Sequence, residues 1–258
     1  MSGAERANCR GLFATATLAL AMALATSAAA GPENLREGLF GHEGFESRAY
    51  SAPAVARYIS EDGDGFVLDR SQGRILLKFD NSPEVWVLFA HPAPRGDVIY
   101  KNDLGEPVLR ATRLGGVTVF TDQRPGGSAA ALAGGGIPLR LAPLGPQALL
   151  ERLAQASARA SRAARRLIPF DADATPASSA LIADAAVVAS EAVVRLTRRP
   201  EGRALLREVK QVRLTEGRRA GVQLTHGALQ ITVSSRDGLA GRPSSERIVL
   251  VAQRAGGP

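Results

Sequence analysis

Between residues 57 and 121, short apolar stretches alternate with turn-forming residues. In one stretch, Ile75, Leu77 and Phe79 fall on one face of an extended segment, whereas Arg74 and Lys78 fall on the other. Clusters of glycine, proline and asparagine separate the stretches, which is typical of an antiparallel meander. The pattern predicts strands near residues 57–60, 66–69, 75–79, 85–89, 98–101, 108–113 and 117–121.

Residues 123–145 are rich in glycine, alanine and proline, with Gly134, Gly135 and Gly136 in their middle. Small side chains offer little apolar surface to bury, and glycine adds conformational freedom. We therefore expect a mobile loop or linker here, which separates a β-rich meander region of residues 31–122 from the rest of the chain.

Helical spacing of apolar residues follows. Leucine and alanine recur with a helical period over residues 146–167, which predicts an amphipathic helix with Pro146 in its first turn. Thr175 as a cap, followed by Pro176, predicts the start of a second helix. Residues 180–194 of that helix are nearly all apolar, so we expect it to be buried on most sides. Pro200 begins a short third helix that ends near residue 208.

The last part of the chain returns to a period of two, which predicts C-terminal antiparallel strands after the helical segment of region 146–258. The stretches are Val212/Leu214, Val222/Leu224, Leu229/Ile231/Val233 and Ile248/Leu250. The expected fold class is therefore α+β, with an antiparallel β-meander, a helical middle and C-terminal β-strands. Whether the two β-rich parts form one sheet or two stays open.

The N-terminus has the three parts of a cleavable secretory signal. A short polar start precedes an apolar run over residues 11–26, and small residues ending at Ala30 offer a cleavage site. A retained membrane anchor is the alternative, but the run is shorter than the roughly 20 residues that span a bilayer. We predict a signal peptide at residues 1–30, a periplasmic or secreted protein, and no transmembrane segment after cleavage. Cys9 leaves with the signal, so no disulfide or thiolate metal site is expected in the remaining chain.

The net charge of +7 is unevenly distributed. From residue 31 to 145, 12 Lys and Arg oppose 14 Asp and Glu, a net of −2, whereas from residue 146 onward 18 oppose 10, a net of +8. One predicted helix carries five arginines against a single acid, Glu151. These candidate residues for binding an anionic surface are Arg152, Arg159, Arg162, Arg165 and Arg166. The alternative is a surface helix whose arginines are simply solvated, because an alanine-rich apolar face inserts weakly into lipid.

Several segments come close to known catalytic or metal-binding motifs without completing them. Gly126-Gly127-Ser128-Ala129-Ala130 lacks the last glycine of a nucleophile elbow. His42-Glu43 begins a zinc motif, but a glutamate replaces the second histidine. Asp62-Gly63-Asp64-Gly65 lacks the later oxygen ligands of a calcium loop, so we interpret it as a hairpin turn. We predict no cofactor and no metal, and the catalytic residues are unknown.

Five segments of the predicted meander carry a resemblance to a known family. They are RYI at 57–59, FVLDRS at 66–71, SPEVW at 82–86, PRGDVIYKND at 94–103 and LRATRLGG at 109–116. Together they resemble an uncharacterised bacterial family called domain of unknown function 4908. The resemblance implies an exported bacterial protein, and it brings no activity, cofactor or site residue.

Two functions remain open. The first is a non-catalytic envelope protein that binds or scaffolds, with anionic lipid or envelope polysaccharide as the expected partner and no nucleic acid. The second is an envelope hydrolase that acts on glycan or peptide through a dispersed carboxylate site, for which Asp69, Glu84, Asp97 and Asp103 are the candidates. A concave pocket that gathers these acids would favour the hydrolase, and acids spread over strand ends would favour binding.

Overall fold

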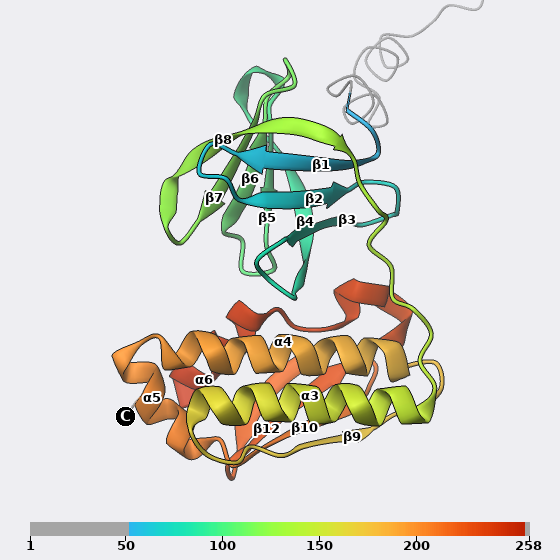
Figure 1. Ribbon diagram of the computed structural model, residues 1–258, viewed down its shortest axis with the longest axis vertical. Coiled ribbons are helices and arrows are strands. Elements are labelled where there is room, and N and C mark those ends of the chain that lie inside the picture. The colour runs from blue at the N-terminus through green and yellow to red at the C-terminus, as the bar shows by residue number, and fades with distance from the viewer. Residues whose placement is uncertain (1–51, 256–258) are drawn as a thin grey trace, which may run out of the picture. The chain divides into compact units, whose positions relative to one another are not determined.

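The computed structural model describes residues 52–255, and the predicted signal peptide and His42-Glu43 lie outside this range. The first part is a closed antiparallel barrel in which each strand pairs with the next and β1 pairs with β8 (Figure 1). Its strands are β1 (Val55–Ser60), β2 (Gly65–Asp69), β3 (Ile75–Phe79), β4 (Val85–Pro92), β5 (Val98–Lys101), β6 (Pro107–Ala111), β7 (Val117–Thr121) and β8 (Arg124–Gly135). The predicted antiparallel strands are confirmed, but they close on themselves rather than form an open meander.

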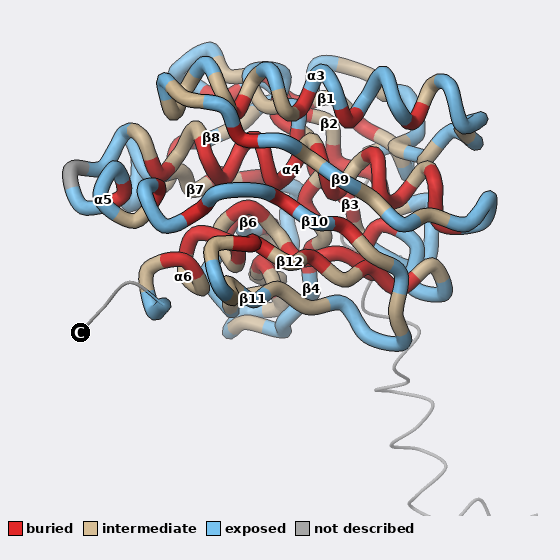
Figure 2. The backbone as a smooth tube through the Cα atoms, turned by 90° about the horizontal axis from the view of Figure 1, so that it is seen from below, coloured by how far each residue is buried: buried red, intermediate tan, exposed pale blue. Residues whose placement is uncertain are grey.

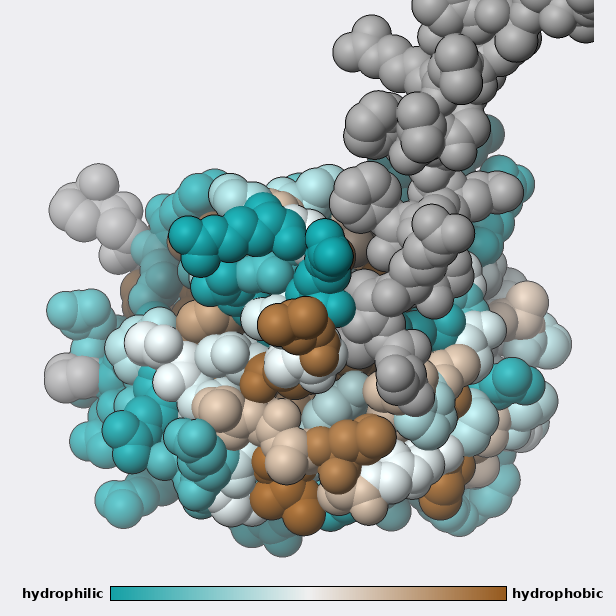
Figure 3. Space-filling view, turned by 90° about the horizontal axis from the view of Figure 1, so that it is seen from above, coloured by the Kyte–Doolittle hydropathy of each residue, from teal (hydrophilic) through white to brown (hydrophobic). Residues whose placement is uncertain are grey.

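Side chains fill the barrel interior, as expected for eight strands. Phe66, Leu68, Leu77 and Leu109 are fully buried there, and the Tyr58 and Phe66 rings stack with their centroids 5.4 Å apart. The apolar positions that alternate along each strand are the ones that point inward. On the face drawn in Figure 3, apolar side chains lie in small groups among hydrophilic ones.

The prediction of a loop or linker over residues 123–145 is wrong for its first half. Residues 124–135 form β8, which hydrogen-bonds to both β7 and β1. Most β8 side chains are exposed, so the strand is specified by its backbone pairing and leaves little apolar signal in the sequence. Gly127 has φ +87°, and a Cβ atom there would lie 2.5 Å from Thr118 Cγ2, so the glycine is required. Residues 136–145 have no regular secondary structure and lead into the next helix.

The second part is a layer of helices on a four-stranded sheet (Figures 1 and 2). Its helices are α3 (Pro146–Ala164), α4 (Ser179–Thr197), α5 (Pro200–Glu208) and α6 (Ser245–Ala255). The strands are β9 (Phe170–Asp173), β10 (Gln211–Glu216), β11 (Gly221–Thr225) and β12 (Ala228–Val233), in the order β11-β12-β10-β9. Helix α4 is buried along most of its length (Figure 2), as its apolar sequence predicts.

Two predictions for this part need correction. The sheet is mixed, since β10 runs parallel to both β9 and β12 and only the β11–β12 pair is antiparallel. Ile248 and Leu250 belong to helix α6, where Ile248, Val249 and Ala252 are buried. Residues 248–251 are a continuous apolar run rich in β-branched side chains, and such a short run fits a strand as well as a helix. Helix α4 also starts later than the Thr175 cap predicts: its N-cap is Ser178 and its first residue is Ser179.

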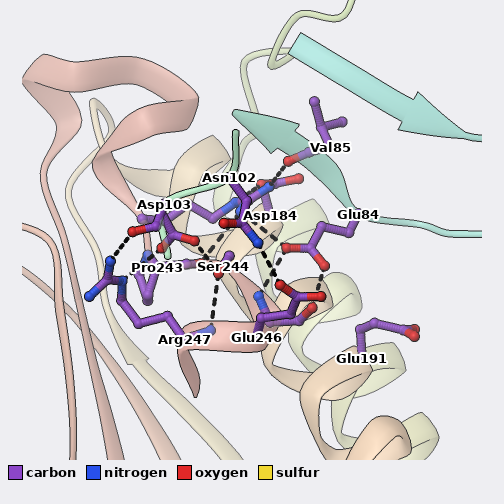
Figure 4. A network of polar contacts seen from close by, with 12 residues as sticks. Glu84, Val85, Asn102, Asp103, Asp184, Glu191, Pro243, Ser244, Glu246 and Arg247 are labelled. Atoms are coloured by element: carbon purple, nitrogen blue, oxygen red, sulfur yellow. Dashed lines mark hydrogen bonds and ion pairs between the residues drawn. The ribbon is translucent and has the colours of Figure 1, made fainter. Parts of the chain in front are cut away.

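A buried polar junction joins the barrel to the C-terminal part (Figure 4). The Arg242 side chain, 2% exposed, donates from Nη2 to the carbonyl oxygen of Val85 at 2.6 Å and from Nε to Asp184. Its Nη1 lies 3.8 Å from Oε1 of Glu84, which is fully buried and also accepts a hydrogen bond from the Ser245 backbone N–H. We call these residues the junction.

Candidate functional site

A cleft of about 530 Å³ lies among the end of the barrel, helix α4 and helix α6. Four carboxylates line it, and we call it the acidic cleft: Asp64, Glu106, Asp122 and Glu246. Arg195 is its one cationic lining residue, while Phe79, Trp86, Val108 and Phe120 supply apolar wall. The cleft continues past Glu246 along α6, where Arg198, Arg199 and Gln253 join the lining.

Asn102 organises the centre of the acidic cleft. This residue is 4% exposed and ends strand β5, where its Oδ1 accepts the backbone N–H groups of Leu104 and Glu106 at 3.0 and 2.9 Å. Its Nδ2 donates to Glu106 Oε2 at 2.9 Å and to Glu246 Oε2 at 2.7 Å. One amide therefore shapes the β5–β6 turn and holds two carboxyl groups close together, which draws α6 to the barrel (Figure 4).

Glu246 has the ionisation behaviour of a functional carboxyl group. Burial raises its pKa to about 7, and the hydrogen bond with Glu106 and the charges of Glu106 and Asp122 act in the same direction. Arg195 opposes this shift from the other side, where its Nη1 donates to Glu246 Oε1 at 3.1 Å. The glutamate thus exists in both protonation states near neutral pH, beside a second carboxylate.

Arg195 and Trp86 line the acidic cleft beside Glu246. The guanidinium carbon of Arg195 lies 5.4 Å from the centroid of the Trp86 ring, and its Nε lies 3.7 Å from Glu191 Oε1. Trp86 is 8% exposed, and its buried indole N–H has no hydrogen-bond partner among the residues that the structure describes. The cleft therefore combines an immobilised cation, an aromatic face and an excess of negative charge.

Four carboxylates against one guanidinium make the acidic cleft suitable for positively charged groups. Two neighbouring carboxyl groups that share a proton also have the composition of a general acid–base pair. Within residues 52–255, no group of three or more His, Cys, Asp or Glu side chains is placed to hold a metal ion. No helix in that range has the length and apolarity needed to cross a membrane.

Comparison with known proteins adds the family. The sequence model of the domain of unknown function DUF4908 matches residues 34–252, which is most of the chain. The chain belongs to the DUF4908 family. No curated protein and no solved structure matches it. The resemblance carried by the barrel segments is thereby confirmed.

The DUF4908 chain does not gather the four acids predicted from its sequence, and none of them lines the acidic cleft. Burial opposes the ionisation of Asp69, but hydrogen bonds from Ser71 and Leu139 lower its pKa. A hydrogen bond from Arg110 lowers the pKa of Asp97. Both carboxylates secure turns of the barrel.

The other two predicted acids belong to the contacts between barrel and C-terminal part. Burial raises the pKa of Glu84, and the nearby Arg242 only partly offsets this effect. Asp103 accepts hydrogen bonds from Arg247 Nε and Ser244 Oγ, both at 2.7 Å. All four predicted acids therefore have structural partners of their own, and the hydrolase site expected from them is not assembled.

Two of the five arginines in the α3 region of DUF4908 donate hydrogen bonds within the fold, and the other three are exposed. Arg159 donates to Glu191 and Ser190 of α4, and Arg166 donates to the backbone carbonyl oxygens of Leu206 and Val209. Arg152, Arg162 and Arg165 are exposed. Binding of anionic lipid or polysaccharide by the exposed three stays a prediction.

Sequence reasoning missed Asn102, Glu106, Asp122 and Glu246. The first three occupy turns of the barrel, and Glu246 lies in a helix predicted as a strand. An asparagine three residues before a turn glycine signals local turn chemistry, but it does not show which distant carboxylates its amide will meet.

Proposed function

We propose that this protein is an exported envelope protein that binds a cationic ligand in the acidic cleft without transforming it. One observation carries the proposal: four carboxylates converge on a cavity of about 530 Å³ whose remaining wall combines aromatic and aliphatic side chains with uncharged polar ones and a single arginine. A cavity of this size and polarity is typical of a small-molecule or peptide site.

The chemistry of the wall narrows the class of ligand. A lysine-like group places an ammonium beside carboxylates and lays its aliphatic stem along aromatic side chains such as Trp86 and Phe120. A cation over an aromatic face adds attraction. Asp122 is exposed at the cleft, so an incoming ammonium meets it without displacing an internal partner. A short basic peptide fits these features.

Calorimetric titration of the purified chain with trilysine tests the proposal, with trialanine as the uncharged probe. Trilysine is expected to bind and trialanine is not. Replacing Glu106→Gln and Asp122→Asn together should weaken binding roughly tenfold, since each exposed charge contact contributes up to about 1 kcal/mol. The matched control, Glu151→Gln with Asp173→Asn, changes the same charge at exposed positions away from the cleft. Equal losses in both variants would show that trilysine responds to net charge alone and would end the proposal.

Export is the second part of the proposal, supported by the three-part N-terminus and the Ala30 cleavage site. Intact-mass measurement of protein recovered from the envelope fraction should give a chain that begins near Gly31. A full-length product retained in the cytoplasm would contradict export.

Hydrolysis of a glycan or peptide is the alternative, because Glu246, with its pKa of about 7, can donate a proton at neutral pH and lies beside a second carboxyl group, Glu106. Incubation of the chain with envelope glycan and with peptides, followed by mass spectrometry, distinguishes the two functions. New products that disappear in Glu246→Gln would establish the hydrolase, and their absence would leave binding.

A further inference from the structure

A second concave site lies away from the acidic cleft. It is a groove of about 940 Å³ lined by barrel strands, by the segment after β8 and by helices α3 and α4. None of its lining residues lines the acidic cleft. We call it the basic groove, after its charged residues Arg57, Lys78, Arg140 and Arg152.

The acids of the basic groove are already paired. Asp80 accepts hydrogen bonds from Arg57, with Nη1 to Oδ1 at 3.0 Å, and Asp184 accepts one from Arg242 of the junction. Both carboxylates therefore have partners within the fold, and the ion pair with Asp80 offsets the positive charge of Arg57.

Three cations of the groove have no such partner. The side chains of Lys78, Arg140 and Arg152 make no hydrogen bond or ion pair with any other residue in the range 52–255. They come from three separate elements: strand β3, the segment after β8 and helix α3. The fold thus directs three uncompensated positive charges to one groove, where an anion would meet complementary charge.

The rest of the groove is largely apolar. Val67 of β2, Leu139 and Leu141 of the connecting segment, and Leu239 near the junction form its wall. Ile137 of the same segment is 83% exposed. The exposed Ile137 side chain and the cations without partners line the same groove, so they can contact a ligand that has an apolar tail and an anionic head.

We propose that the basic groove binds a single-chain anionic amphiphile. Lys78, Arg140 and Arg152 hold its carboxylate or phosphate head, and the leucines of the connecting segment contact its alkyl chain. The concave site favours one amphiphile molecule over a bilayer surface, because its cations line a hollow. Of the five arginines predicted to bind an anionic surface, this site uses Arg152 alone.

Calorimetric titration with decanoate below its micelle concentration tests this site, with decyl maltoside as the uncharged amphiphile. Saturable binding of one decanoate per chain is expected, without comparable binding of decyl maltoside. The variant Lys78→Gln/Arg140→Gln/Arg152→Gln should bind decanoate at least about tenfold more weakly, since each partly exposed charge contact contributes a factor of roughly two to five. A control with the same charge change, Arg162→Gln/Arg207→Gln/Arg218→Gln, alters exposed arginines outside the groove and should bind like the native chain.

Three outcomes would overturn the proposal. Equal weakening in both triple variants would mean that decanoate responds to net charge. Equal binding of decyl maltoside would mean an apolar site without a head-group contact. Binding to vesicles of anionic lipid, without binding of monomeric decanoate, would make a bilayer surface the occupant. The single variant Arg152→Glu, at an exposed and unpaired position, repeats the test if the half-buried Lys78 proves necessary for folding.

Discussion

Replacement of Arg242 by methionine removes the central cation of the junction while keeping most of its aliphatic volume. The Arg242 side chain is 2% exposed, forms an ion pair with Glu84 and donates hydrogen bonds to Asp184 and to the carbonyl oxygen of Val85. Methionine carries no charge and donates no hydrogen bond, so Asp184 and the Val85 carbonyl oxygen lose a donor, and Glu84 loses its nearby positive charge. Breaking a buried ion pair on one side costs about 3–5 kcal/mol, because the remaining charge stays buried without compensation. For a domain of this size that corresponds to a fall in Tm of roughly 6–20 °C.

The loss of folding stability in Arg242→Met should depend on pH. Burial already raises the pKa of Glu84, and the loss of Arg242 removes the main influence that lowers it. A carboxyl group whose pKa is higher in the folded than in the unfolded state destabilises the fold as pH rises through that interval. The deficit relative to the native chain is therefore larger near pH 8 than near pH 5, where Glu84 takes up a proton. Urea unfolding followed by circular dichroism measures it.

Glu84→Gln provides the matched control for this prediction. Glutamine removes the buried charge and still accepts the hydrogen bond from the Ser245 backbone N–H. The double variant Arg242→Met/Glu84→Gln should recover about half or more of the lost stability near pH 8. A deficit below about 1 kcal/mol in Arg242→Met, or one that is the same at both pH values and unaffected by the second change, would refute this account of the junction.

Three other substitutions test separate parts of the structure. The native chain should lose stability relative to Glu246→Gln between about pH 5 and pH 8, because the raised pKa of about 7 disfavours the charged form of Glu246 in the fold. The pKa shift corresponds to about 3 kcal/mol before solvent screening and on the order of 1–2 kcal/mol after it. Urea unfolding of both chains at pH 5 and pH 8 measures the difference. Arg159→Gln loses its contact with the buried Glu191 of α4 and should lower the free energy of unfolding by about 1–3 kcal/mol. Arg162→Gln, at an exposed position of the same helix, should change it by less than about 0.5 kcal/mol. Equal losses would contradict a structural role for Arg159. Gly127→Ala should cost roughly 1–3 kcal/mol more than Gly63→Ala in thermal unfolding, because both glycines have positive φ but only Gly127 has a side chain within 3 Å of the new Cβ atom.

The barrel strands β1 to β7 and helix α4 could be predicted from the sequence because their patterns are local. These strands carry short runs of apolar residues, whose alternate members are buried in several of them, and turn residues mark their ends. Helix α4 has apolar residues on nearly all sides, and only a buried helix accounts for that.

Strand β8 and helix α6 could not be predicted because their specification is not local. The glycine and alanine residues of β8 bury little, and the strand forms because β1 and β7 each present an unpaired edge to it. In α6, Ile248 and Leu250 fit an alternating pattern, and only contact with the rest of the fold selects the helical face.

The acidic cleft shows why residue types alone did not reveal the site. Asn102 and Glu106 lie in one turn of the barrel, whereas Glu246 lies near the end of the chain. Among the acids proposed from the sequence, Glu84 and Asp103 reach the same region but hold the C-terminal part in place. Whether a carboxylate has a structural role or lines a binding site depends on its contacts in the folded chain. The sequence pattern shows only which residues lie next to it along the chain.

The order of strands in the barrel has a consequence for how the chain folds. Every pairing from β1 to β7 joins consecutive strands, so each forms as soon as its hairpin is available. The closing pair joins Ala56 to Gly135, and no earlier contact replaces it. A nascent chain that ends before residue 124 therefore presents two open strand edges, which are templates for intermolecular pairing. Synthesis of the last strand is the step at which the barrel stops being prone to aggregation.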